Sequence, residues 1–381
     1  MTINNEHKKL NFSNEREQSQ TCLNSAEHEK NQGRKVLNVP NLRFKEFEGE
    51  WVGKTIGDIA PLQRGFDLPT GQINNGKFPV VYSNGIMNYH SSYKCVAPGL
   101  ITGRSGTIGK FTYIEDGYYW PHNTSLWVTN FYDNNPKFIY YLFQTIRIGQ
   151  YSTGSGVPTL NRNNVHRHQT FIPKLEEQKE IATFLSLLDE RIATQNKIID
   201  KLLSLIKGIR NKLFENDKDW RKAKIREFLC IGNGKDYKHL DIGDIPVYGT
   251  GGKMLSVNDF LYDGDSVCIG RKGTIDTPLF LTGKFWTVDT LFYTYGFKDV
   301  LPKFCYYLFK QINWQLYNEG TGVPSLSKST IENIKVRIPS IVQQYKICYI
   351  LDSYEDKIKN EGLILDLYCS QKQYLLRQMF V

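Results

Sequence analysis

The sequence predicts an α/β protein built as an internal repeat. We expect two globular mixed α/β bodies and two long helices that pack antiparallel as an intramolecular coiled coil. Three observations carry this prediction: a heptad pattern over 175–214, a set of motifs that recurs about 166 residues later, and short β-branched and aromatic runs between glycines and prolines. Together they predict a pseudo-two-fold relation within one chain.

The long helices are predicted from aliphatic residues that alternate at spacings of four and three, the a/d seam of a coiled coil. The same phase recurs 166 residues later, so the chain supplies its own partner helix. Glu361 and Lys372 fall in the second seam, and we therefore expect the second helix to pack less tightly. The predicted seam comprises Ile181, Leu185, Leu188, Ile192, Ile199, Leu202, Ile206, Ile209, Ile347, Leu351, Ile358, Leu365 and Leu375.

The two bodies are predicted from the repeated motifs. Trp51 opens one body and Trp220 the other, and each body contains β-type runs broken by turn residues, followed by one short helix. The matching motifs are Gly-Arg-x-Gly-Thr-Ile at 103–108 and 270–275, and Gly-x-Gly-Val-Pro at 154–158 and 320–324. A repeat of this kind indicates duplication and not yet a function.

The net charge of +9 is concentrated on the bodies. Residues 51–173 hold ten basic and five acidic side chains, and 220–339 hold sixteen and twelve, while both helical segments are neutral. Two basic bodies joined by neutral helices favour a polyanion held at two places, although an excess of this size is also ordinary for a globular domain.

Several classes of protein are not expected. No stretch approaches 18 apolar residues, and the first residues lack the features of a signal peptide, so we expect a cytoplasmic chain without a membrane span. The seven cysteines form no CxxC pair, which favours reduced thiols and no metal site. His166 and His168 could be metal ligands, but a basic surface or a phosphate contact is favoured because no Cys, Asp or Glu partner recurs in the other copy.

Candidate DNA contacts lie in the matching turns. Arginine suits bidentate contact with guanine or phosphate, and the alternative for Arg104 and Arg271 is a structural turn with an internal salt bridge. Asn84 could read adenine or simply form a turn. His122 and Asn123 in the first body align with Asp289 in the second. Such a chemical difference would suit two bodies that read different base sequences, and it would equally result from neutral drift. The candidates are Tyr82, Asn84, Arg104, Ser105, Lys110, His122, Asn123, Lys253, Arg271, Lys272 and Asp289.

Over residues 40–381 the chain resembles the specificity subunits of Type I restriction-modification enzymes. Leu-Glu-Glu-Gln-Lys-Glu-Ile-Ala at 175–182 is similar to the start of that family's spacer helix, and 103–109, 154–160 and Ile172-Pro173 are similar to its recognition domains. The second copy departs from the pattern at 341–348 and at Asp276-Thr277.

Residues 1–40 are rich in Asn, Gln, Glu, Lys and Ser, and we expect them to form a polar tail. The resemblance implies target recognition domains at 41–173 and 217–339, and spacer helices at 174–216 and 340–381. It implies that the domains read the two halves of a bipartite double-stranded DNA target, and that two modification (methyltransferase) subunits and the restriction subunits dock on the chain. S-adenosylmethionine, ATP and Mg²⁺ would bind those partners, and this chain would hold no cofactor and no catalytic residue.

Two other functions stay open from the residues alone. One is a non-DNA scaffold with two repeated protein-binding domains. The other is a self-sufficient DNA enzyme, which the lack of an Asn-Pro-Pro-Tyr motif and of a nuclease carboxylate cluster disfavours.

Overall fold

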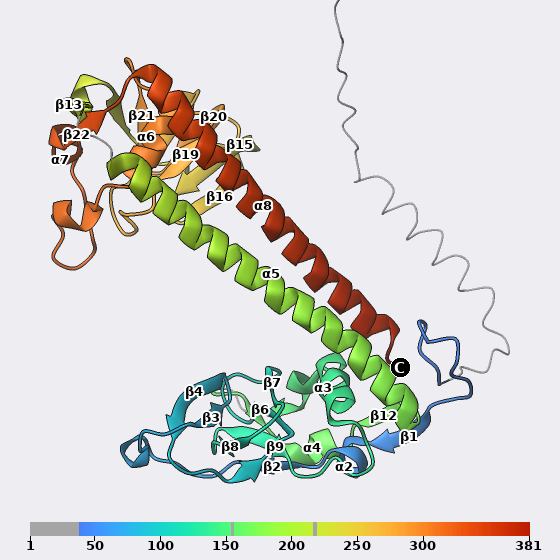
Figure 1. The fold of residues 1–381 in the computed structure, drawn as a ribbon. Coiled ribbons are helices and arrows are strands. Elements are labelled where there is room, and N and C mark those ends of the chain that lie inside the picture. The colour runs from blue at the N-terminus through green and yellow to red at the C-terminus, as the bar shows by residue number, and fades with distance from the viewer. Residues whose placement is uncertain (1–37, 154–155, 216–218) are drawn as a thin grey trace, which may run out of the picture. The chain divides into compact units, whose positions relative to one another are not determined.

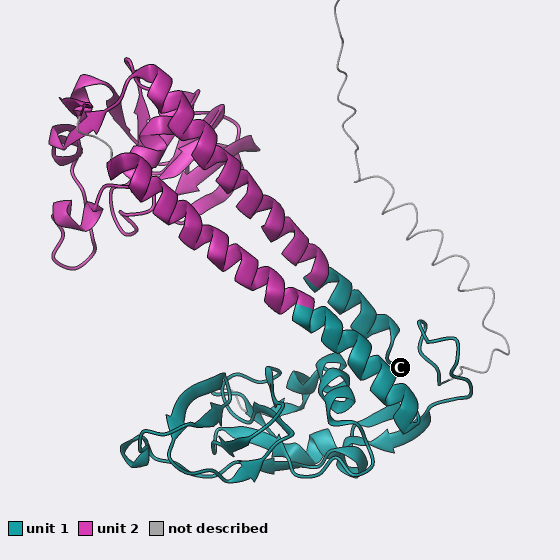
Figure 2. Cartoon of the chain, in the orientation of Figure 1, with its two compact units in different colours: residues 1–190, 369–381 teal, residues 191–368 magenta. Residues whose placement is uncertain are grey.

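The computed structural model describes residues 38–153, 156–215 and 219–381, and it divides the chain into two compact units (Figures 1 and 2). Unit 1 comprises 1–190 and 369–381, and unit 2 comprises 191–368. Each unit therefore holds one body together with a part of each long helix. Except for 38–40, the predicted polar tail lies outside the described residues.

In its described part, the body of unit 1 contains two four-stranded sheets, in the orders β2-β9-β6-β7 and β4-β3-β8-β5. The pair β3–β8 is parallel, and its neighbours are antiparallel. The strands are β1 (Val52–Thr55), β2 (Leu62–Arg64), β3 (Phe78–Tyr82), β4 (Gly85–His90), β5 (Cys95–Val96), β6 (Gly99–Gly103), β7 (Phe111–Ile114), β8 (Tyr118–Pro121), β9 (Ser125–Val128), β10 (Ser152–Thr153), β11 (Thr159–Leu160) and β12 (Gln169–Ile172).

The described residues of unit 2 repeat this plan, with sheets in the orders β14-β21-β18-β19 and β16-β15-β20-β17. Again one inner pair, β15–β20, is parallel. The strands are β13 (Arg221–Lys224), β14 (Cys230–Asn233), β15 (Ile242–Gly249), β16 (Gly252–Val257), β17 (Tyr262–Asp263), β18 (Ser266–Gly270), β19 (Leu279–Leu281), β20 (Lys284–Thr287), β21 (Leu291–Tyr295) and β22 (Lys335–Ile338). The matching strand orders confirm the predicted repeat.

A two-stranded ribbon closes each body by pairing its first strand with its last. In unit 1, Val52 lies opposite Ile172 across β1–β12. In unit 2, Arg221 lies opposite Ile338 across β13–β22. Each long helix begins a few residues after its ribbon ends, so the ribbon fixes where the helix leaves the body.

The long helices follow the prediction, whereas each body contains more short helices than the one predicted. The long ones are α5 (Leu175–Glu215) and α8 (Ile341–Gln378), each continuous from end to end. The short ones are α2 (Ile56–Ile59), α3 (Pro136–Thr145), α4 (Arg162–His166), α6 (Pro302–Phe309) and α7 (Lys328–Asn333), with 3₁₀ turns at Thr70–Gln72, Ile148–Tyr151, Ile225–Glu227 and Trp314–Tyr317. No helix in the described part of the chain is long and apolar enough to cross a membrane.

Two contacts fix the antiparallel direction of α5 and α8. Within unit 2, Gln195 Nε2 donates to Glu361 Oε2 at 2.6 Å. Within unit 1, Lys372 Nζ lies 2.7 Å from Asp189 Oδ1. The lower-numbered residue of α5 thus contacts the higher-numbered residue of α8, as in antiparallel helices. Gln195 and Glu361 are repeat counterparts, 166 residues apart, and they contact each other.

Every residue of the predicted seam is buried or half-buried. Burial along the two seams is mixed. Leu188 and Leu202 on α5 are buried and their counterparts Tyr354 and Tyr368 on α8 are half-buried, whereas Ile209 on α5 is half-buried and its counterpart Leu375 is buried. The looser packing expected of the second helix stays a prediction. Lys372 is stabilised in its seam by Asp189.

Two buried glutamines attach the helices to the bodies. Gln178 accepts a hydrogen bond from Asn135 N at 2.9 Å and donates to Pro173 O at 3.0 Å. Its counterpart Gln344 accepts from Leu301 N at 2.8 Å and donates to Pro339 O at 3.0 Å. The second copy of the helix-start motif thus keeps the one side chain that makes these contacts.

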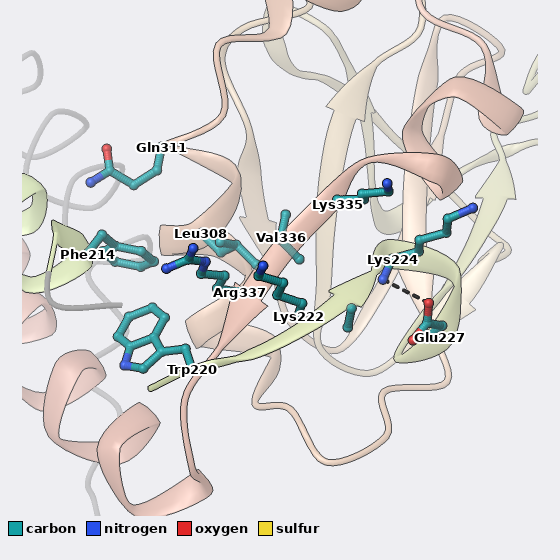
Figure 3. A pocket seen from close by; sticks show the side chains of 11 residues that line it. Phe214, Trp220, Lys222, Lys224, Glu227, Leu308, Gln311, Lys335, Val336 and Arg337 are labelled. Carbon is teal, nitrogen blue, oxygen red and sulfur yellow. Dashed lines mark hydrogen bonds between the residues drawn. The ribbon is translucent and has the colours of Figure 1, made fainter. Parts of the chain in front are cut away.

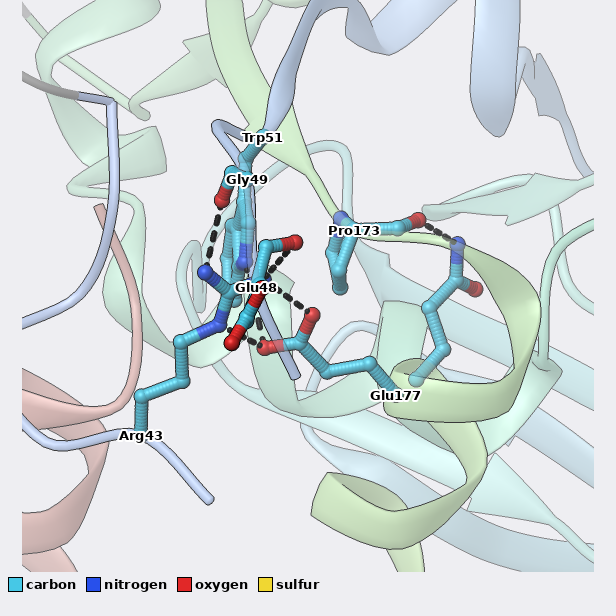
Figure 4. Close-up of polar contacts among 7 residues, drawn as sticks. Arg43, Glu48, Gly49, Trp51, Pro173 and Glu177 are labelled. Atoms are coloured by element: carbon cyan, nitrogen blue, oxygen red, sulfur yellow. Dashed lines mark hydrogen bonds and ion pairs between the residues drawn. The ribbon is translucent and has the colours of Figure 1, made fainter. Parts of the chain in front are cut away.

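Unit 1 adds a tie that unit 2 lacks at the matching position. The Arg43 guanidinium donates to both carboxylate oxygens of Glu177, each at 2.8 Å, and Trp51 Nε1 donates to the same carboxylate at 3.3 Å (Figure 4). Glu177 and its hydrogen bond hold the pKa of Arg43 above its ordinary value. The counterpart of Glu177 in α8 is the neutral Gln343. Residues 38–50 are thereby tied to the first turn of α5.

Candidate nucleic-acid interface

The Gly-Arg-x-Gly loop after β6 is held by two other loops of unit 1. Arg104 N and Ser105 N both donate to Thr124 O, at 2.8 and 3.2 Å, and Gly106 N donates to Pro158 O at 3.1 Å. Leu160 N returns a hydrogen bond to Arg104 O at 2.7 Å. The loop is therefore a fixed crossing of three chain segments.

The loop after β18 repeats these bonds one for one in unit 2. Arg271 N and Lys272 N donate to Thr290 O, at 2.7 and 3.3 Å, and Gly273 N donates to Pro324 O at 2.9 Å. Leu326 N donates to Arg271 O at 2.9 Å. The two units thus present different side chains on one backbone arrangement.

The glycines of the motif are required by this geometry. A Cβ built on Gly103 would lie 1.8 Å from Thr107 O, and one on Gly270 would lie 2.0 Å from Thr274 O, which no side chain can tolerate. Gly106 and Gly273 have φ of +81° and +86°, a region that glycine adopts at little cost. The alternative for Arg104 and Arg271 was a structural turn with an internal salt bridge, and the turn is present.

The internal salt bridge that this alternative required is not found. Within the described residues, neither the Arg104 nor the Arg271 guanidinium forms an ion pair with a carboxylate. Arg271 makes one long hydrogen bond, from Nη1 to Asp289 O at 3.5 Å, and its side chain is exposed. Among the described residues neither guanidinium is neutralised by a carboxylate, and Arg104 is half-buried whereas Arg271 is exposed.

Further candidates of unit 1 gather around the same loop. The Tyr82 and His122 rings lie 4.1 Å apart at 33°, and burial lowers the pKa of His122, so this ring is neutral near pH 7. Lys110 Nζ donates to Asn84 O at 2.5 Å. Asn123 donates to the carboxylate of Asp67. One side of unit 1 therefore combines a cation, amides and a ring stack.

The candidates of unit 2 are less interconnected. Lys253 is exposed at the start of β16, opposite Tyr248, and Asp289 is exposed beside Arg271. Arg271 and Lys272 line a hollow together with Glu319 and Lys328. Hydrogen bonds from Thr330 and Ser327 lower the pKa of Glu319, so its carboxylate is charged at neutral pH.

Two side chains at the candidate interface were not predicted from the sequence. Asp67, which also pairs with Arg64 at 3.0 Å, and Glu319 both stand next to predicted contacts. Neither residue belongs to a repeated motif, so the repeat gives no indication of them. The position of Glu319, immediately before the Gly-x-Gly-Val-Pro motif, was the available signal.

His166 and His168 do not face outward as phosphate contacts. Leu62 N donates to His166 Nε2 at 2.8 Å, and the Tyr151 hydroxyl lies 2.7 Å from His168 Nδ1. That expectation is wrong, because both rings complete hydrogen bonds inside unit 1. In the described residues, no group of His, Cys, Asp or Glu side chains could hold a metal ion.

Comparison with known proteins bears on both units. The family model of the Type I restriction modification DNA specificity domain matches residues 48–204 and again 217–366. A Haemophilus influenzae protein assigned as a type I restriction enzyme specificity subunit is 23% identical over 363 residues, which cover 86% of this chain and 93% of that protein. The MjaVIII specificity subunit of Methanocaldococcus jannaschii is 24% identical, with 58% and 64% covered.

Solved structures agree on the fold. The S subunit of the Type I restriction-modification system of M. genitalium has a TM-score of 0.62 at 19% identity, covering 90% of this chain and 99% of that one. A chain from a type I R-M system solved for its complex assembly and conformational transition has a TM-score of 0.53 at 14% identity, covering 86% and 96%.

Proposed function

This chain belongs to the family of Type I restriction-modification specificity subunits, and we propose that it binds a bipartite double-stranded DNA target, one half through each unit. The observation that carries the proposal is the repeated loop crossing. The same backbone hydrogen bonds hold Arg104-Ser105 in unit 1 and Arg271-Lys272 in unit 2. An invariant frame with changed side chains is what reading two unlike half-sites requires.

The proposed contacts are the candidates predicted from the sequence. The guanidinium groups of Arg104 and Arg271 suit the O6 and N7 atoms of guanine, and the Asn84 amide suits adenine. Lys110, Lys253 and Lys272 are proposed to contact phosphates, which position the duplex without reading it. The remaining proposed contacts are Tyr82, Ser105, His122, Asn123 and Asp289.

In this proposal the helix pair is both the spacer between the half-sites and the docking surface for two modification subunits and the restriction subunits. Large apolar side chains off the seam support a docking role. Leu187 on α5 is 54% exposed, and Tyr345 and Tyr349 on α8 are 62% and 79% exposed. S-adenosylmethionine, ATP and Mg²⁺ would bind in those partner chains, and this chain would supply specificity without catalysis.

Selection from a pool of random duplexes tests the proposal. The full chain, assembled with its modification subunits, should enrich two short base patterns separated by a gap of fixed length. Its affinity should fall as salt rises, because contacts with phosphates release counterions. Enrichment of no pattern, with an affinity that salt leaves unchanged, would instead favour the protein scaffold.

A further inference from the structure

The ribbon of unit 2 carries an unusual concentration of positive charge. The register of β13–β22 puts Lys222 directly opposite Arg337 and Lys224 directly opposite Lys335. Directly opposed residues share one face of an antiparallel pair, as do residues two apart on one strand. Four cations therefore share one face, while Ala223 and Val336 between them pack toward the core.

Like charges placed directly opposite each other destabilise a strand pair, and Lys224 opposite Lys335 is such a pair. Within the described part of the chain, none of the three lysines forms an ion pair with a carboxylate. Lys224 Nζ reaches only the amide oxygen of Asn333, at 3.3 Å. Glu227, the nearby carboxylate, accepts the backbone N–H of Lys224 at 3.0 Å, and Figure 3 shows this bond beside the hollow that the basic side chains line.

The fold itself does not require these charges. Aligned through Trp51 and Trp220 and through the 166-residue offset, the ribbon of unit 1 has the same register and no charge at any of the four positions. Those positions are Gly53, Thr55, Gln169 and Phe171. The basic face is therefore a property of unit 2 alone.

The basic face is continuous with the candidate interface of unit 2. Lys328, at the start of α7, lines one hollow with Arg271 and Lys272. Along α7, Thr330 and Asn333 line a second hollow that ends at Lys335. Lys335 also lines the third hollow, with Lys222 and Lys224. Lys328 also pairs with Glu332 on α7, at 3.7 Å. Three neighbouring hollows thus lead from the recognition loop, along α7, to the ribbon, with cations at both ends.

We propose that DNA bound by unit 2 continues beyond the recognised bases onto this ribbon, where Lys222, Lys224 and Lys335 contact its phosphates without reading sequence. The inference rests on the proposed function and deepens it. Duplex DNA fits this row of hollows because its phosphates form a continuous row of negative charge, whereas a single small anion would occupy one hollow only. Unit 1 makes no such contact, so the two flanks of the target are held unequally.

The test compares the wild-type full chain, in its complex with the modification subunits, with the triple variant K222Q/K224Q/K335Q. Arg337 is left in place. Two duplexes carry the selected target: one ends at the target's edges, and the other extends by about ten base pairs, one helical turn, on each side. Affinity for both is measured against salt. Lys54→Gln, an exposed lysine on the ribbon of unit 1, is the matched control.

On the extended duplex, the slope of log K against log salt should be less steep for the triple variant than for the wild type, by roughly 2–3, since each phosphate contact contributes about −0.9 to the slope. Its affinity should drop there and change little on the short duplex, and its preference for target over non-target DNA should stay. Lys54→Gln should behave as the wild type. Circular dichroism should show that the triple variant folds.

Three results would overturn the inference: an unchanged salt slope on the extended duplex, a lost sequence preference on the short one, or weaker assembly with the modification subunits at an unchanged DNA slope. The last would assign the ribbon to an acidic protein surface. Failure of the wild type to select any target would refute the proposed function instead, so the two failures are distinguishable.

Discussion

Units 1 and 2 have the same strand order, the same loop crossing and the same glutamine contact at the helix start, yet their surfaces differ in charge. The outward face of β13–β22 carries four cations, and the matching face of β1–β12 carries none. In the Gly-Arg loop, the residue after the arginine is Ser105 in unit 1 and Lys272 in unit 2. The comparison teaches that duplication preserved the positions that hold the backbone, and that exposed positions were free to take on separate contacts.

The largest expected effect concerns the C-terminal ends of the two long helices, where matching phenylalanines pack on the two units. Phe380, two residues past the end of α8, stacks on Phe138 at 5.3 Å in unit 1, and its counterpart Phe214 of α5 stacks on Phe304 at 5.6 Å in unit 2. Phe380 is buried, whereas Phe214 is half-buried beside an open hollow. We expect Phe380→Ala to destabilise unit 1 by about 3–5 kcal/mol, and Phe214→Ala to destabilise unit 2 by about 1–2 kcal/mol.

Hydrogen exchange followed separately in α3 and α6 measures these two losses. Each substitution should act on its own unit. Equal losses would show that the hollow beside Phe214 does not weaken its packing, and a loss in the wrong unit would refute the pairing of each helix end with its body.

The recognition loops give a smaller effect that separates the half-sites. Arg104→Ala should cost about 1–3 kcal/mol of DNA binding and relax the preference at one half of the target, and Arg271→Ala should do the same at the other half. Arg→Lys at each position is the matched control, because it keeps the charge and loses the bidentate geometry. Selection of targets with each variant shows which half responds. A loss shared by both halves would place these arginines on phosphates.

The smallest expected effect is a pH dependence of the stability of unit 1 that arises from its histidines. Burial lowers the pKa of His122, His166 and His168 from the ordinary 6.5. The unfolded chain then binds protons more readily than the folded one. The stability of unit 1 should therefore be highest above pH 6.5 and fall as the pH drops below it.

Denaturant unfolding at about pH 8 and about pH 5.5, a range in which histidine titrates, measures this effect. His166→Gln is the control, because an amide oxygen can accept the Leu62 N–H without titrating. It should reduce the pH dependence. A variant as sensitive to acid as the wild type would remove His166 from the explanation.

Much of the fold could be predicted because it depends on patterns along the chain. The heptad spacing defined both helices and their seam, and the repeated motifs implied that the two bodies share one topology. The β1–β12 and β13–β22 pairings could not be predicted, since each joins strands more than a hundred residues apart with no turn to set the register. The opposed lysines become visible only once that register is known.

The candidate site was predicted in part for a similar reason. Motif matching found Arg104 and Arg271, because their glycines are required by the backbone. It did not find Asp67 or Glu319, which lie close to the site only through folding. His166 and His168 were predicted to lie on the surface. A sequence does not reveal that the His166 ring accepts the N–H of Leu62, or that the His168 ring bonds with the Tyr151 hydroxyl.

Exchange of a whole body tests the central claim most directly. Residues 51–173 would be replaced by the equivalent body of another family member, and the methylated sites would be sequenced in cells that carry the hybrid chain and its partner subunits. We predict that one half of the target changes, while the other half and the gap stay the same. A change in both halves together would contradict the assignment of one half-site to each unit.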